Sequence, residues 1–217
     1  MTLPIELRGV SKSFAGIKAV NAVSFDVRPG EVHALLGENG AGKSTLIKIM
    51  AGLHHPDDGE MLVNGQTVRF ASPREAHAAG IATVHQELLL FPELTVAENI
   101  FLGQTPKTSL GAIDWTTMRR RSRALLDSLD SRELDIDQKV ASLSVANRQR
   151  IEIARALAQD ARVVIMDEPT AALAEADVQR LMDIVRKLRA NGVSIVYVSH
   201  RMPEIFALAD RVTVLRD

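Results

Sequence analysis

Nine consecutive residues, GENGAGKST at 37–45, have the types and spacing of a phosphate-binding loop. They match G-x-x-x-x-G-K-[ST], with an apolar run from Val32 before them and a predicted helix from Lys43 after them. An ordinary glycine-rich turn is disfavoured because a lysine and a serine both stand in register. Glycines let backbone N–H groups converge on an anion, and the helix N-terminus adds partial positive charge. The residues expected to bind phosphate are Gly37, Asn39, Gly40, Gly42, Lys43, Ser44 and Thr45.

A second segment with side chains that could do chemistry, VVIMDEPT at 163–170, has two carboxylates at the end of an apolar run. Ligands of open α/β sheets bind at the C-terminal ends of the strands. Asp167 is suited to a magnesium shell together with the Ser44 hydroxyl, and Glu168 to polarising a water for attack on a γ-phosphate. A carboxylate pair at a solvated strand end is the alternative, and the loop at 37–45 disfavours it.

Composition narrows the function classes. The 217 residues carry 26 basic and 27 acidic side chains, a net charge of −1, so no positive field indicates nucleic acid as a partner. Cysteine is absent, which excludes disulfides and thiol nucleophiles and suits a reducing compartment. No apolar run approaches the roughly 18 residues of a membrane helix, and the N-terminus lacks a secretory pattern. Any membrane role is therefore expected to come through a partner.

The first third of the chain is predicted to be rich in strands. These are expected over 5–13, 19–27, 31–37 and a hairpin at 61–70. Asn64-Gly65 supplies the tight turn of the hairpin. A helix is expected from Ser72, with Pro73 at its first position and Glu75 three residues after the cap.

The middle of the chain favours helices and the last third returns to α/β alternation. Thr95 and Glu98 form a capping-box pattern that predicts a helix through Leu102. Longer helices are expected over about 114–129 and 144–159. Three near-continuous apolar runs fit parallel strands buried on both faces: 163–166, 194–198 and 212–215. An amphipathic helix over 178–188 precedes the Asn191-Gly192 stop signal.

Together these segments resemble the nucleotide-binding domain of ATP-binding-cassette (ABC) transporters over essentially the whole chain. Residues 37–45 correspond to the Walker A motif and 163–168 to Walker B. Residues 143–157, LSVANRQRIEIARAL, are similar to the family signature LSGGQ and its helix. That third element separates this family from other P-loop proteins.

The resemblance assigns roles to further residues. Gln86 matches the Q-loop glutamine, which implies a catalytic and metal-sensing role beside Ser44 and Asp167. His200 matches the switch histidine that contacts the γ-phosphate. Phe14 matches the aromatic residue that stacks on adenine. Each match is weak alone, and their order along the chain favours the functional interpretation.

The resemblance implies one α/β ABC ATPase domain, 1–217, with a P-loop NTPase (RecA-like) core. The core is expected over about 1–87 and 156–217, with an antiparallel β-subdomain near the N-terminus. A helical signature subdomain is expected over about 88–155. The implied ligands are ATP and Mg²⁺.

Finer features resemble the N-terminal half of tandem sugar-import ATPases. They are VHQELLLFPELTVAENIFLG at 84–103, the unusual LSVANRQ, and YVSHRMPEIFALADRVTVLRD at 197–217. The resemblance implies ATP hydrolysis that powers uptake of a sugar or related polyol. Because such chains continue beyond the position of Asp217, we expect a native chain roughly twice this long.

The implied partners are a second cassette, membrane permease subunits and, indirectly, an external sugar-binding protein. The second cassette would be the C-terminal half of the same chain, or another copy for a fragment. No nucleic-acid partner is expected. The implied location is the cytoplasmic face of the inner membrane, held peripherally.

Two departures from the family pattern concern what this domain offers a partner. Val145 and Ala146 replace the signature glycines, and their Cβ atoms should hinder a close backbone approach to a phosphate. Ala174 stands where the family's D-loop aspartate is expected. Ser144 keeps the hydroxyl and the helix-cap role.

Two other function classes remain open. One is a soluble cassette ATPase that acts on ribosomes or DNA repair intermediates, which would normally carry a basic linker or a long coiled-coil insertion. The other is a nucleotide-sensing module with little turnover, which the retention of Glu168 and His200 disfavours. Co-fractionation with a membrane permease would discriminate between these classes.

Overall fold

The N-terminal part of the chain forms an antiparallel sheet, as its alternating apolar residues and the Asn64-Gly65 turn predict. The computed structural model describes residues 2–86 and 89–216. The strand order of this sheet is β2-β1-β4-β5. Its strands are β1 (Ile5–Phe14), β2 (Ile17–Val27), β4 (Asp58–Val63) and β5 (Gln66–Val68).

A second sheet, entirely parallel, holds the candidate chemistry at the ends of its strands. Its order is β6-β7-β8-β3-β9. The strands are β3 (Val32–Gly37), β6 (Ile81–Val84), β7 (Val163–Asp167), β8 (Ser194–Val198) and β9 (Arg211–Leu215). The register pairs Asp167 with Val198 and Gly37 with Leu215. Residues that follow β3, β7 and β8 therefore meet at one edge, which confirms the predicted P-loop architecture.

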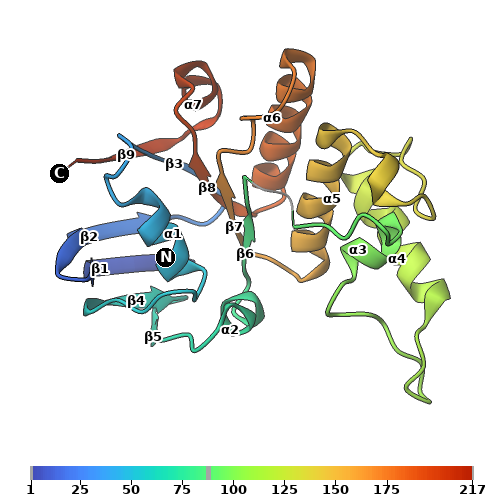
Figure 1. Cartoon of the computed structure of the whole chain (residues 1–217), viewed down its shortest axis with the longest axis horizontal. Coiled ribbons are helices and arrows are strands. Elements are labelled where there is room, and N and C mark those ends of the chain that lie inside the picture. The colour runs from blue at the N-terminus through green and yellow to red at the C-terminus, as the bar shows by residue number, and fades with distance from the viewer. Residues whose placement is uncertain (1, 87–88, 217) are drawn as a thin grey trace.

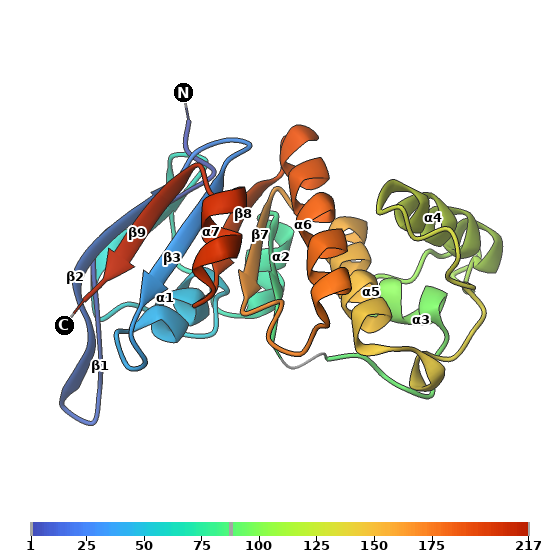
Figure 2. The same cartoon turned by 90° about the horizontal axis from the view of Figure 1, so that it is seen from above.

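Of the eight helical segments in the described residues, some pack near the sheets, whereas α3 and α4 form a cluster on the far side of α5 (Figures 1 and 2). The eight segments are α1 (Lys43–Met50), α2 (Pro73–Ala78), α3 (Val96–Ile100), α4 (Trp115–Ser128), η1 (Val140–Ser142), α5 (Val145–Ala158), α6 (Glu175–Ala190) and α7 (Met202–Leu208). In both views α3 and α4 lie beyond α5, away from the sheets. This cluster is the helical element that the signature resemblance implies.

The parallel sheet is the wall between two hydrophobic cores. Successive residues of a strand point to opposite faces, so Val163 and Ile165 join one core while Val164 and Met166 join the other. The first core also contains α1 and the antiparallel sheet, and the second contains residues of α3, α4, α5, α6 and α7. Burial on both faces explains the continuous apolar run of β7.

The predicted burial of residues 212–215 on both faces is wrong. Strand β9 pairs only with β3 and forms the edge of the parallel sheet. Val212 and Val214 are 49% and 65% exposed, while Leu215 is buried. An edge strand has a neighbour on one side only, so a β-branched run there does not guarantee burial.

The two predicted helix caps behave differently. Thr95 and Glu98 make both hydrogen bonds of a capping box, as predicted, although α3 ends at Ile100 rather than Leu102. Ser72 makes no side-chain cap bond. Glu75 instead accepts a hydrogen bond of 2.8 Å from the amide of Ala71, one residue before the cap.

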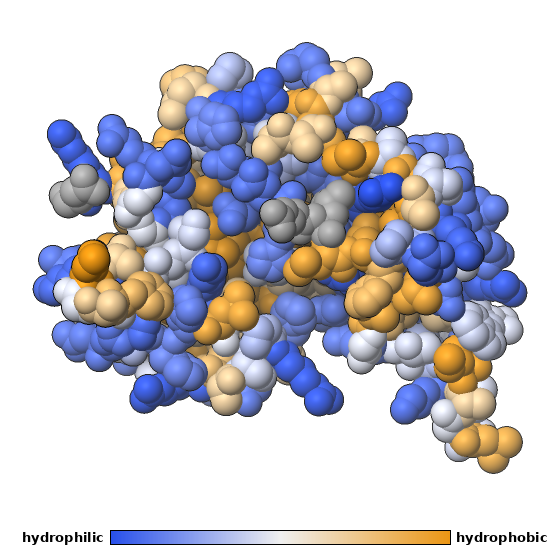
Figure 3. Space-filling view, viewed as in Figure 1, coloured by the Kyte–Doolittle hydropathy of each residue, from blue (hydrophilic) through white to orange (hydrophobic). Residues whose placement is uncertain are grey.

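The loop between α3 and α4 projects from the helical cluster. Leu110 is 94% exposed and Ile113 is 44% exposed. In the space-filling view, hydrophobic surface appears on the projection at the lower right (Figure 3). Among the residues that the structure describes, no helix is both long and apolar enough to span a bilayer.

The predicted limits of the core and the helical subdomain stay a prediction. Their first boundary, between residues 87 and 88, lies outside the described residues, as does Asp217.

Candidate nucleotide-binding site

A cavity of about 320 Å³ opens at the strand ends of the parallel sheet. Its lining joins segments far apart in the sequence: the loop after β3, the residues after β6, and the end of β7. The lining residues are Ala19, Asn39, Gly40, Gly42, Lys43, Ser44, Thr45, Gln86, Asp167 and Glu168. All but Ala19 are candidate site residues from the sequence, and the fold brings them to one place.

Close contacts require glycine at two positions of this loop, Gly37 and Gly42. Gly42 has a φ of 92°, and a Cβ built there would lie 2.4 Å from the carbonyl oxygen of Ala19. Gly37 lies outside the cavity lining, where a Cβ would meet the carbonyl oxygen of Leu215 at 2.7 Å. The loop is therefore pressed between β2 and β9. The contribution of Ala19 is its backbone, so no residue-type signal could have revealed it.

Lys43 shapes the loop directly. It is the first residue of α1, and its Nζ donates hydrogen bonds to the carbonyl oxygens of Gly37 (2.6 Å) and Glu38 (2.9 Å). The ammonium group thus spans the loop from the cavity side. Its positive charge and the N-terminus of α1 both favour an anion in the cavity.

The cavity offers oxygen ligands of the kind that Mg²⁺ prefers: the Ser44 hydroxyl, the Gln86 amide and the Asp167 carboxylate. Burial raises the pKa of Asp167, and the negative charge of Glu168 raises it further. A buried carboxylate beside a second one is stabilised by a bound cation. These residues therefore fit the metal.

His85, which the sequence analysis did not single out, lies beside this set. Burial lowers its pKa, and the charge of Asp167 partly opposes that effect. It follows β6 and directly precedes Gln86 in the chain, and a histidine at a strand end is the signal by which the sequence could indicate it.

Glu168 occupies an unusual backbone position. Its φ is 47°, in the left-handed region, and its amide donates a 2.9 Å hydrogen bond to the carbonyl of Val198. Non-glycine residues in this conformation are uncommon and cluster at functional sites. The hydrogen bond ties the backbone of Glu168 to the end of β8.

His200 follows β8 and faces Glu168. Its Nδ1 lies 3.2 Å from Glu168 Oε2, and 72% of its side chain is exposed. His200 borders a neighbouring cavity that also contains Ser199 and Met202, rather than the phosphate cavity itself. The exposed position leaves the ring accessible to a ligand that approaches from outside the domain.

Phe14 does not line the phosphate cavity. It lies at the end of β1, is 42% exposed, and contacts the edge of the His54 ring with centroids 5.1 Å apart. Lys12 Nζ is 5.6 Å from the Phe14 ring centroid. Its expected stacking on adenine therefore stays a prediction.

The signature segment begins α5 and touches the Walker B turn. Ser144 Oγ accepts a 3.3 Å hydrogen bond from the Asn147 amide, which confirms its role as the helix cap. Val145, at the first helical position, is 43% exposed. Farther along α5, buried Gln149 donates a hydrogen bond to the Pro169 carbonyl. This bond joins the signature helix to the turn after Glu168.

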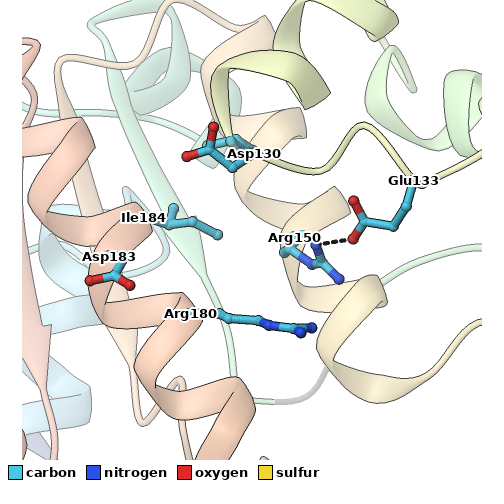
Figure 4. Close-up of a pocket in the computed structure, with 7 residues that line it drawn as sticks. Asp130, Glu133, Arg150, Arg180, Asp183 and Ile184 are labelled. Atoms are coloured by element: carbon cyan, nitrogen blue, oxygen red, sulfur yellow. Dashed lines mark hydrogen bonds and ion pairs between the residues drawn. The ribbon is translucent and has the colours of Figure 1, made fainter.

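A larger cavity, of about 440 Å³, lies between α5, α6 and the segment after α4 (Figure 4). Its charges are mixed and mostly paired. Arg150 forms an ion pair of 2.5 Å with Glu133 and donates to Ser131, while Lys187 pairs with Asp130 at 2.9 Å. It includes none of the residues that the sequence indicated for phosphate chemistry.

A profile of the ABC transporter family matches residues 20–171. The chain is 56% identical over 212 residues to a ribose import ATP-binding protein of Rubrobacter xylanophilus, and 52% identical over 215 residues to one of Chromobacterium violaceum. A putative ribose/galactose/methyl galactoside import ATP-binding protein of Hahella chejuensis is 51% identical over 213 residues. These matches cover 97–99% of this chain but only 41–43% of the relatives, so the chain spans less than half their length.

Solved structures agree with the fold. A nucleotide-free ATP-binding cassette from an ABC transporter has a TM-score of 0.86 at 27% identity, with 99% of this chain and 88% of that one covered. A dimeric ATP-binding cassette in a post-hydrolysis state, bound to ADP and Pi, has a TM-score of 0.82 at 27% identity. The match covers 98% of this chain and 94% of that one.

Proposed function

Because this chain belongs to the ABC transporter family, we propose that it is the ATP-binding and hydrolysing cassette of an importer for a sugar or related polyol. The observation that carries the proposal is the single cavity in which Lys43, Ser44, Gln86, Asp167 and Glu168 meet. The names of the relatives, which specify ribose or ribose/galactose/methyl galactoside import, support the substrate class. The cassette bound to ADP and Pi supports the reaction.

ATP binds with its phosphates against the loop at 37–45. The loop amides and the N-terminus of α1 hold the phosphate oxygens, and Lys43 moves from its two carbonyl partners to the β- and γ-phosphates. Phe14 stacks on adenine. Ser44, Gln86 and Asp167 would hold Mg²⁺, which would supply positive charge to stabilise the phosphate oxygens.

Hydrolysis depends on positioning and electrostatics. Glu168 accepts a proton from the attacking water, and Gln86 orients that water. His200, whose Nδ1 lies 3.2 Å from Glu168 Oε2, contacts the γ-phosphate and positions it for attack by the water. No covalent intermediate with the protein is needed, because phosphoryl transfer to water is accelerated by in-line placement and charge stabilisation.

The proposed partners rest on the family of the chain and on the import functions named for its relatives. A second cassette supplies its signature to the site built on Lys43, while Ser144, Val145 and Ala146 face the partner's nucleotide. Permease subunits provide the transport path, and an external sugar-binding protein delivers the substrate to them. We place the chain peripherally at the cytoplasmic face of the inner membrane, with a core at about 1–87 and 156–217 and a helical subdomain at about 88–155.

The decisive experiment measures ATP hydrolysis by the full-length protein reconstituted with its permease and binding protein in liposomes. We expect hydrolysis to rise when a sugar such as ribose or galactose is added with the binding protein. The Glu168→Gln form serves as the inactive control. A rate of ATP hydrolysis that no tested sugar or polyol changes, in a preparation that binds ATP, would contradict the importer assignment.

A further inference from the structure

One buried carboxylate outside the phosphate cavity gathers an unusual number of hydroxyl groups. Glu204, in the first turn of α7, is 2% exposed. Its Oε2 accepts hydrogen bonds from Tyr197 Oη (2.8 Å), Thr170 Oγ1 (2.9 Å) and Ser199 Oγ (3.1 Å). The three donors come from the end of β8, the turn after β7 and the residue that follows β8.

The other oxygen of Glu204 faces a cation. Oε1 lies 2.8 Å from an Arg201 guanidinium nitrogen, as an ion pair whose angles fall outside those of a hydrogen bond. The Arg201 amide also donates a 3.0 Å hydrogen bond to Ser199 Oγ. Both chain neighbours of His200 are therefore held, directly or through the serine, by the same carboxylate.

The same carboxylate also reaches the Glu168 side of the site. Thr170 stands two residues after Glu168, in the turn that leaves β7. That turn is fixed from the opposite side by the hydrogen bond from Gln149 to the Pro169 carbonyl. Glu168 itself is tied to the end of β8 through its amide and the Val198 carbonyl.

The energetics favour this cluster as a fixed unit. A buried carboxylate is costly unless its oxygens receive hydrogen bonds and a counter-charge. Glu204 accepts three hydroxyl hydrogen bonds at Oε2 and has the Arg201 counter-charge beside Oε1, and hydrogen bonds to a charged acceptor are stronger than neutral ones. Burial, together with the negative charge of Glu204, raises the pKa of Tyr197, which keeps that hydroxyl a donor.

We propose that Glu204 is a positioning residue that fixes the spacing between His200 and Glu168. It does so by holding Ser199 and Arg201 on either side of His200 and Thr170 beyond Glu168. It lines neither the phosphate cavity nor the cavity beside His200, so its action passes through these backbone segments. This inference rests on the proposed ATPase function of the same site.

The test compares Glu204→Gln with the parent in the full-length protein assembled with its permease. The amide keeps the shape but loses the charge and replaces one acceptor oxygen by a donor. We expect kcat for ATP hydrolysis to fall about 10- to 100-fold, since a displacement of about 1 Å of reacting groups has effects up to this size. KM for ATP should change less than about twofold. Glu175→Gln is the matched control, because it removes the exposed partner of the same Arg201.

A double-mutant cycle separates positioning from general stability. In a His200→Ala background there is no imidazole left to place, so we expect Glu204→Gln to lower kcat there by less than about threefold. Equal losses of kcat in the two backgrounds would overturn the proposal, because they would mean that Glu204 acts without His200. Unchanged kcat in the single variant would overturn it as well.

Ser199→Ala keeps the inference testable if Glu204→Gln does not fold. It removes the hydrogen bond that Ser199 donates to Glu204 and the one that it accepts from the Arg201 amide. We expect a several-fold loss of kcat, and no such loss in the His200→Ala background. Normal kcat in this variant would contradict the proposal. Lys43→Ala and Glu168→Gln identify which idea fails: if neither impairs hydrolysis, the ATPase assignment and the inference fall together. If both impair it and the Glu204 and Ser199 variants do not, only the inference falls.

Discussion

The phosphate loop (37–45) and the signature segment (143–157) of this chain, called below the phosphate end and the signature end, differ in how closely they match their family pattern. At 37–45 every position expected to hold phosphate is present, and Gly42 approaches the Ala19 carbonyl as only a glycine can. At the start of α5, Val145 and Ala146 replace both signature glycines, and the Val145 side chain is 43% exposed. The cap residue Ser144 nevertheless keeps its hydrogen bond.

From this difference we infer that the cassette matches the family pattern at its own proposed nucleotide site and departs from it in the segment that would face a partner's site. In a head-to-tail pair, the Lys43 site would be closed by the partner's signature, and Val145 and Ala146 would meet the partner's nucleotide. In the phosphate loop and in the signature, glycine matters because it has no Cβ. Only the phosphate loop of this chain has its glycines. We therefore expect unequal hydrolysis at the two sites of a tandem protein.

The strongest test of the phosphate end is Glu168→Gln. Loss of a general base typically slows a reaction about 100- to 10,000-fold, and we expect turnover by the tandem protein to fall by at least about 100-fold while ATP still binds. Steady-state phosphate release and equilibrium binding of ATP measure the two effects. Glu93→Gln, at an exposed glutamate of the helical cluster, is the matched control. Near-normal turnover in Glu168→Gln would show that the water is activated elsewhere.

Removal of the loop cation should act on affinity. In Lys43→Ala we expect MgATP to bind about 100-fold more weakly, because charge-assisted hydrogen bonds contribute roughly 1.5–3 kcal/mol each. Titration calorimetry measures the affinity, and circular dichroism verifies the fold. Lys187→Ala removes a distant lysine paired with Asp130 and should leave binding unchanged. A folded Lys43→Ala variant that binds MgATP normally would contradict the phosphate assignment.

The signature end is tested by restoring its glycines. In the isolated chain, self-pairing offers the intact phosphate loop only the altered signature, so we expect weak hydrolysis. The double substitution Val145→Gly and Ala146→Gly should raise activity several-fold, with a steeper dependence on protein concentration. Glycine also destabilises a helix interior by about 1 kcal/mol per residue, so Ala124→Gly in α4 is a control for that effect. Equal activity in parent and double-glycine variant would remove the argument for unequal sites.

The smallest expected effect is a difference in acid sensitivity between the two ends. Burial lowers the pKa of His33, His77 and His85, and no histidine stands between residues 86 and 199. An unfolded histidine binds a proton below about pH 6.5, which the buried neutral rings resist. Stability should therefore fall as the pH drops through 6.5 toward the lowered folded values.

Hydrogen exchange at pH 7.5 and 5.5, corrected for intrinsic rates, resolves where this loss occurs. We expect the strands around His33 and His85 to lose protection first, while α4 loses little. A His33→Gln variant should show a weaker pH dependence. Uniform loss of protection across the whole chain would contradict a local origin of the acid sensitivity.

Local chemistry explains why the phosphate end could be predicted from the sequence. The spacing from Gly37 to Thr45 and the apolar run before Asp167 each define a strand end by themselves. The cap at Thr95 was predictable for the same reason, since both partners of its hydrogen bonds lie within four residues. These patterns involve residues that are close in sequence, so the rest of the fold does not alter the local structure that they predict.

Some features could not be predicted because their local pattern is weak, and others because they depend on distant partners. The seven-residue helix α7 belongs to the first kind, since Pro203 and its short length leave little periodicity. The exposure of Val214 follows from the edge position of β9, which depends on the order of all five strands. The role of Glu204 arises from hydroxyl groups 5 to 34 residues away, and its sequence neighbourhood resembles an ordinary helix start.

The two carbonyl bonds of Lys43 have a thermodynamic consequence for any measurement of affinity. Two of the three donors of its ammonium group are already engaged by the carbonyl oxygens of Gly37 and Glu38, so nucleotide binding partly exchanges acceptors rather than only adding new interactions. The measured contribution of Lys43 is thus the difference between phosphate and carbonyl partners, smaller than the full strength of a lysine–phosphate contact. The same exchange would leave two loop carbonyls needing new donors, so part of the heat of binding reports on the loop itself.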